Sequence, residues 1–105
     1  MVQKDAPRPS TPTGALPLET VAVHLHLWDH VAIAKVDLAP GTVLTWQGSD
    51  GPRQVTVHQP VPGGHKLALE ALSAGDAVRR YGQVIGFATQ PIQPGAHVHT
   101  HNLGL

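Results

Sequence analysis

The sequence predicts an all-β domain, mainly β, with short strands and at most short helical turns. The 105-residue chain contains 11 glycines and 10 prolines, which leave no uninterrupted stretch for a long helix. Its apolar segments are short, and some alternate with polar residues in the period of two that is typical of a half-buried strand. A corner motif recurs along the chain. This length predicts one small domain.

The first 18 residues differ from the rest. Pro7, Pro9, Pro12 and Pro17 stand among polar residues and a glycine. Proline removes backbone donors, and nothing in this stretch builds an apolar face. We therefore expect a disordered proline-rich arm over residues 1–18 and the domain over residues 19–105. A dispensable tail and a docking segment both fit this composition.

The first expected strand begins after the arm. Its residues alternate in the order Val21, Ala22, Val23, His24, Leu25, His26, Leu27. Successive side chains of a strand point to opposite faces, so we expect the valines and leucines to face the core. His24 and His26 would then lie on the opposite, polar face.

The other apolar segments are also expected to be strands: residues 31–36, 43–47, 53–58, 84–89 and 96–102. The turn residues 48–51, Gly-Ser-Asp-Gly, lie between two of them and predict a β-hairpin. Residues 67–72 fit either a strand or one helical turn by propensity alone.

The corner motif is Ala-x-x-x-(Leu/Ile)-x-x-Gly followed by a valine. It occurs three times, beginning at Ala34, Ala68 and Ala88. Glycine fits where a chain must take positive φ, so we expect each copy to turn at its glycine. The unequal spacing of the copies indicates a single β module rather than a solenoid.

Composition excludes several functional classes. Seven basic residues balance seven acidic ones, and a nucleic-acid site would need a basic patch. The chain has no cysteine, so it has no disulfide framework, thiolate metal site or cysteine nucleophile. No apolar run approaches the roughly 20 residues of a membrane span.

Histidine is the unusual residue, with eight copies. His97, His99 and His101 alternate with Val98 and Thr100, so in an extended strand they would share one face at about 6.6 Å spacing. Imidazoles so placed can ligate a metal ion such as zinc, copper, iron or nickel. Asn102 follows and could offer its amide to a ligand. A solvated histidine face is the alternative interpretation.

Three further segments are candidates for chemistry. Gly63 and Gly64 allow a sharp turn that presents His65 and Lys66, although a plain turn also fits. His26 could add a ligand from the first strand or simply belong to its polar face. Tyr81, after two arginines, could belong to an anion contact or to a solvated surface.

Several motifs occur together in a specific order: Asp29-His30-Val31-Ala32-Ile33-Ala34, Gly64-His65-Lys66-Leu67-Ala68-Leu69, Tyr81-Gly82-x-x-Ile85-Gly86-x-Ala88 and Gly95-Ala96-His97-Val98-His99-Thr100-His101-Asn102. This order closely resembles the SAF-type N-terminal domain of the altronate/galactarate dehydratase family. The same module forms free-standing small subunits of altronate dehydratases and the alpha subunit of sulfolactate sulfo-lyase. The resemblance covers roughly residues 19–103.

The resemblance implies a β-clip fold and a β-elimination on a hydroxylated carboxylic acid. It also implies a divalent metal cofactor, iron(II) or manganese(II). Carried over residue by residue, it implies three groups: catalytic His65 and Lys66; metal ligands His97, His99 and His101; and substrate contacts His26, Tyr81 and Asn102.

The family's large catalytic region is missing from this chain. The resemblance therefore implies either a small subunit with a large dehydratase subunit as partner or an excised N-terminal domain. It also implies a sugar-acid substrate, in the cytoplasm, and it leaves a homo-oligomer open. We expect no nucleic-acid or membrane partner. Three alternatives stay open: a non-catalytic binding or assembly module, a sulfo-lyase alpha subunit, and a histidine-rich metal buffer.

Overall fold

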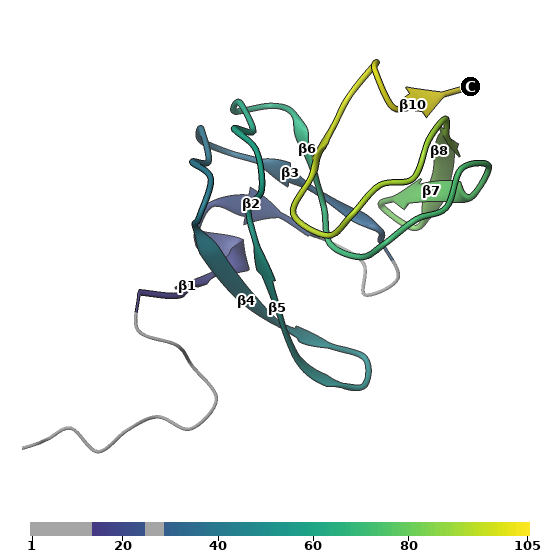
Figure 1. Cartoon of the computed structure of the whole chain (residues 1–105). Coiled ribbons are helices and arrows are strands. Elements are labelled where there is room, and N and C mark those ends of the chain that lie inside the picture. The colour runs from purple at the N-terminus through teal and green to yellow at the C-terminus, as the bar shows by residue number, and fades with distance from the viewer. Residues whose placement is uncertain (1–13, 25–28) are drawn as a thin grey trace, which may run out of the picture.

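The computed structural model describes residues 14–24 and 29–105, and these residues form an all-β fold, as predicted (Figure 1). Their only helix is a single 3-10 turn, and none of their helices is long and apolar enough to cross a membrane. The elements in order are β1 (Leu16–Pro17), η1 (Leu18–Thr20), β2 (Ala22–Val23), β3 (Val31–Ala34), β4 (Val43–Gly48), β5 (Gly51–Thr56), β6 (Lys66–Ala68), β7 (Ala77–Arg80), β8 (Gln83–Ala88), β9 (His97–Val98) and β10 (Leu103–Gly104).

The described strands form three small sheets, in the orders β1-β4-β5, β2-β3-β6-β9 and β10-β8-β7. β1 runs parallel to β4, and the other strand pairs are antiparallel. In Figure 1 the pair β3 and β6 lies between the long β4–β5 hairpin and the β7–β8 hairpin. The predicted hairpin over residues 43–58 is confirmed, with a two-residue turn between paired Gly48 and Gly51.

Two apolar clusters lie on opposite faces of the central pair β3 and β6. Ala32 and Leu67 belong to the first cluster, together with residues of η1, β4 and β5. Val31 and Ala68 belong to the second, together with residues of β7, β8 and β9. Because strand side chains alternate, both faces of this pair are buried, and its segments are almost wholly apolar.

The corner motif is confirmed at all three copies. Gly41, Gly75 and Gly95 have φ of 91°, 92° and 88°. A fourth corner ends at Gly64, with φ of 87°. This corner departs from the motif, because Val57 stands in place of the alanine seven residues before its glycine.

The four corners pair in twos. Leu38 bridges to Val61, and Leu72 bridges to Ile92. After each bridge the chain turns back: Gly64 N–H donates to the Ala34 carbonyl, and Gly95 N–H donates to the Ala68 carbonyl. The two pairs of corners therefore repeat one hydrogen-bonding scheme. Each pair is followed by a strand of the central sheet, β6 after the first pair and β9 after the second.

The first strand differs from its prediction. β2 contains only Ala22 and Val23, and Ala22 is the buried residue whereas Val23 is half-buried. Ala22 faces Ala34 across the sheet, and both pack into the first cluster, where the close approach of the strands favours small side chains. Residues 25–27 of the predicted strand lie outside the described residues.

The predicted strand over residues 96–102 is also corrected. Only His97 and Val98 are strand; the chain then turns over residues 99–102 and returns as β10. The Asn102 side chain causes the turn: its Oδ1 accepts the His99 N–H at 3.0 Å, and its Nδ2 donates to the His97 carbonyl at 3.0 Å. Such local side-chain bonds compete with continued strand pairing.

The structure differs from the predicted elements at three other places. The ambiguous segment 67–72 contributes to a strand, β6, and β7 was not predicted at all. Leu16 and Pro17 pair with β4, and Leu18 is buried in the first cluster, so the fold begins before residue 19. Residues 1–13 of the expected arm lie outside the described residues.

We predict that Gly95→Ala destabilises the protein far more than Gly41→Ala. Both glycines have positive φ, which costs an alanine about 1–2 kcal/mol, but a Cβ on Gly95 would also collide with the Thr56 carbonyl oxygen. A Cβ on Gly41 meets nothing within 4 Å. Urea unfolding should show at least about 2 kcal/mol more loss for Gly95→Ala. Equal losses would contradict the close approach.

Candidate metal centre

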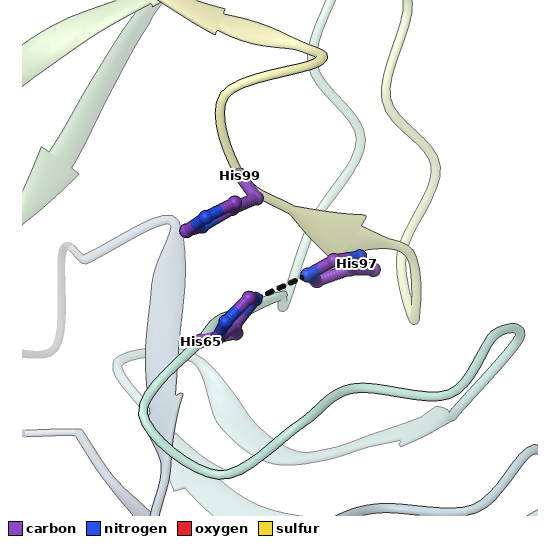
Figure 2. Close-up of side chains that lie close together, drawn as sticks. All are labelled: His65, His97 and His99. Atoms are coloured by element: carbon purple, nitrogen blue, oxygen red, sulfur yellow. Dashed lines mark hydrogen bonds between the residues drawn. The ribbon is translucent and has the colours of Figure 1, made fainter.

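Three imidazoles converge at one edge of the central sheet. One ligand nitrogen from each of His65, His97 and His99 lies within 4.8 Å of the other two (Figure 2). We call these three residues the histidine group. All three side chains are half-buried, which leaves one side of the group accessible.

Strand register explains this convergence. In the β6–β9 pair, Lys66 faces Val98 and Leu67 faces His97. One further step along the same antiparallel register places His65 opposite His99. Directly opposed residues lie about 4.5–5.5 Å apart at Cβ, and diagonal ones are within reach of long side chains. His65 is therefore opposite one histidine and diagonal to the other.

The three rings lie nearly parallel. The His65 and His99 centroids are 4.0 Å apart with 19° between the planes, and those of His65 and His97 are 5.0 Å apart with 27°. His65 Nδ1 and His97 Nε2 are 2.8 Å apart in a hydrogen bond, drawn dashed in Figure 2. One of these two nitrogens must accept, so it carries no proton and its lone pair is engaged in this hydrogen bond.

The surroundings favour neutral imidazoles. Partial burial is the main cause that lowers the pKa of His97, followed by the charges that His65, His101 and His99 would carry. The pKa of His99 is lowered by desolvation first, then by His65, Lys66 and His101. Neutral imidazole is the form that ligates metals, so these shifts keep the group ready to bind one at neutral pH.

Two neighbouring side chains fix the backbone that carries the group. Gln59 Oε1 accepts the His97 N–H at 2.8 Å. Asn102, only 5% exposed, bonds the backbone of both His97 and His99. The Asn102 amide, predicted as a substrate contact, is thus engaged in the turn that positions two ligands.

The remaining predicted metal and catalytic residues lie close by but outside the histidine group. The His101 ring is 5.2 Å from that of His97, tilted by 41°, and His101 is not one of the three convergent ligands. His65 takes its place. Lys66 pairs with Ile33 and Val98. The pKa of Lys66 is lowered by burial and then by Arg80.

One predicted substrate contact, Tyr81, is not brought to the group. Tyr81 lies at the tip of the β7–β8 hairpin with φ of 56°, and its ring stacks under the Arg80 guanidinium at 4.9 Å. The buried carboxylate of Asp29 accepts the N–H groups of Tyr81 and Gly82, both at 2.7 Å, so the Asp29 and Tyr81 motifs stabilise one turn. His26 lies outside the described residues.

Sequence reasoning missed a polar cleft beside the group. The cleft has a volume of about 420 Å³, and its lining includes Gln59, Gln90, Gln93, His101 and Asn102. A signal was present in the sequence, because each of these three glutamines directly precedes a proline. Such dipeptides tend to begin turns, and here all three turns present their glutamine to one cleft.

Comparison with known proteins gives a family match and several relatives. The family model for the altronate/galactarate dehydratase SAF domain matches residues 20–105. Over 80 residues, or 76% of this chain, it is 41% identical to an altronate dehydratase of Escherichia coli (strain K12) and 34% identical to one of Bacillus subtilis (strain 168). This chain spans only 15% of the length of each of those proteins.

A third relative matches this chain over most of its own length. Over 60 residues, or 57% of this chain, it is 45% identical to the (2R)-sulfolactate sulfo-lyase subunit alpha of Paracoccus pantotrophus. The matched region covers 87% of that subunit.

We predict that His97 and His99 titrate below the ordinary histidine pKa of 6.5. Below pH 6.5 the unfolded chain then binds more protons than the folded chain. The free energy of unfolding therefore falls as the pH drops from 6.5 toward the folded pKa values. Titration of the imidazole carbon-bound protons by NMR measures this. His65→Ala should raise both pKa values, because it removes a neighbouring charge, whereas His58→Ala should leave them unchanged. Midpoints at or above 6.5 would contradict the assignment.

Proposed function

Because the chain belongs to the altronate/galactarate dehydratase SAF-domain family, we propose that it is the SAF component of a metal-dependent hydro-lyase that dehydrates a sugar acid. The observation that carries this proposal is the convergence of His65, His97 and His99 within 4.8 Å. Three convergent imidazoles with an accessible side suit a divalent metal that keeps open positions for substrate oxygens.

The proposed metal is iron(II) or manganese(II), held by the histidine group. The bound ion would supply Lewis-acid stabilisation of the negative charge that develops beside the substrate carboxylate. This ligand set differs from the one that the resemblance implied, because His65 replaces His101. His101 is then the histidine next to the ligands that stays free to move a proton.

The chain's own residues have distinct roles in this proposal. The free imidazole of His101 accepts the proton from the carbon next to the carboxylate. The electron pair of that C–H bond forms a carbon–carbon double bond, and the neighbouring hydroxyl takes the proton back from His101 and leaves as water. Lys66, whose charge lowers the pKa of His99, neutralises an anionic group of the acid. The enol product converts to a 2-oxo acid.

The proposed partner is a large dehydratase subunit that completes the site. This chain spans 15% of the length of the matched altronate dehydratases, so most of such an enzyme lies outside the region it shares with them. The half-exposed histidines are also suited to an interface, since a second surface would exclude water from them.

A sulfo-lyase alpha subunit is the second candidate function. The observation that favours it is coverage, since the aligned region spans 87% of the Paracoccus pantotrophus subunit. The same proton removal would then expel sulfite instead of water. An assay of sulfite release from sulfolactate by the assembled enzyme separates the two candidates.

We predict one metal ion per chain. Calorimetric titration with Mn²⁺, or with Fe²⁺ under anaerobic conditions, should give a single site. His65→Ala or His99→Ala should weaken binding at least about 100-fold. His101→Ala should leave it within about threefold, and His24→Gln, a half-buried histidine packed on Trp46, is the matched control. Equal losses of affinity in His101→Ala and His65→Ala would contradict this ligand set and favour the one with His101. Binding of several ions per chain would favour a metal buffer.

We predict that turnover needs both polypeptides. The chain mixed with a separately produced large dehydratase subunit should dehydrate altronate, and His101→Gln should lower kcat at least about 100-fold while Mn²⁺ affinity is kept. Lys66→Met should mainly raise KM. Full turnover by the 105-residue chain alone would refute the shared site. An unchanged kcat with a raised KM in His101→Gln would indicate a binding module.

A further inference from the structure

The polar cleft, which we call the glutamine cleft after Gln59, Gln90 and Gln93, lies next to the histidine group. Gln59, which lines the cleft, accepts the N–H of His97 at 2.8 Å. His101, on the same wall, has its ring 5.2 Å from that of His97. Ala96, directly before His97, also lines the cleft. The histidine group and the cleft are therefore neighbours, and His101 lies between them.

The volume and chemistry of the cleft fit a neutral polar chain. About 420 Å³ lies within the usual range for small-molecule sites, roughly 300–1,000 Å³. The lining residues include no lysine, arginine, aspartate or glutamate. A carboxylate would find no lysine or arginine here, whereas the carboxamides both donate and accept hydrogen bonds, as hydroxyl groups do.

The cleft also has an apolar wall. Pro91 and Ile92 line it between Gln90 and Gln93, and Ile92 is 2% exposed. Its bridge to Leu72 fixes this wall against the second apolar cluster. A carbon chain that carries hydroxyls on one side can lay its C–H face on such a wall and turn its hydroxyls toward the amides.

We infer that the glutamine cleft binds the hydroxylated tail of the acid, so that this domain selects long polyhydroxy acids over three-carbon acids. The inference rests on the proposed function, because the acid end of the substrate is placed at the histidine group. Gln90 and Gln93 are then specificity-determining residues. A three-carbon acid bound at the histidines has no tail to reach them.

The test compares three probes on the full chain by calorimetry and NMR: altronate, which has six carbons; glycerate, which has three; and galactitol, a six-carbon polyol without a carboxylate. We expect the Mn²⁺-loaded chain to prefer altronate over glycerate. The double variant Gln90→Ala/Gln93→Ala should weaken altronate binding at least about tenfold. It should leave the affinities for glycerate and Mn²⁺ within about twofold of those of the unchanged chain. Gln47→Ala/Gln54→Ala, exposed on the β4–β5 hairpin, is the matched control.

Galactitol separates failure of this inference from failure of the proposed function. It needs no metal, so the metal-free chain should still bind it weakly and shift the side-chain amide resonances of Gln90 and Gln93. Loss of Mn²⁺ binding with retained galactitol binding would refute only the metal assignment. No preference for altronate, an equal loss of both acids in the cleft variant, or galactitol shifts elsewhere would overturn the cleft inference.

Discussion

The pairing register of β6 is the constraint on which the candidate site depends. β6 pairs with β3 on one side and with β9 on the other, and both of its faces are buried. A slip of one residue would turn Leu67 from the first cluster toward the second and Lys66 toward the first, so the apolar clusters hold the register strongly. That register alone places His65 opposite His99. The ligand geometry is thus fixed by core packing and needs few dedicated contacts of its own.

Positive-φ corners deliver the strands to this register. Gly64 turns the chain into β6, and Gly95 turns it into β9, each by donating to an alanine carbonyl of the neighbouring strand. The residues that follow these two glycines include all three members of the histidine group. The segment leading to the Gly95 corner carries Gln90 and Gln93, so the cleft and the group share one structural origin. A fold that repeats a corner places its functional residues at the ends of the repeats.

The sequence was sufficient for local features and insufficient for partners across strands. It predicted the all-β class, the long hairpin and the three glycine corners, because alternation, turn residues and positive φ are properties of short segments. It failed at β2, where the alternation does not say which face is inward, and at residues 99–102, where the Asn102 side chain stops the strand. His65 could not be joined to His97 and His99 without the β6–β9 register, since 32 residues separate it from His97. The Gln-Pro dipeptides were visible, but only the fold brings them together.

A division of charge between two neighbouring regions explains how so small a domain could recognise a sugar acid. In the proposed function the histidine group would hold the metal and Lys66 would supply positive charge, both suited to the carboxylate end. The cleft next to them offers amides and no lysine, arginine, aspartate or glutamate, which suits the hydroxylated end. Reversed binding would place the carboxylate among neutral amides and the hydroxyls at the metal, so the arrangement orients the acid as well as holding it. Orientation matters for an elimination, because the base must reach one particular carbon–hydrogen bond. With the acid held in this direction, His101 stands at the boundary between the two regions, beside the carbons next to the carboxylate.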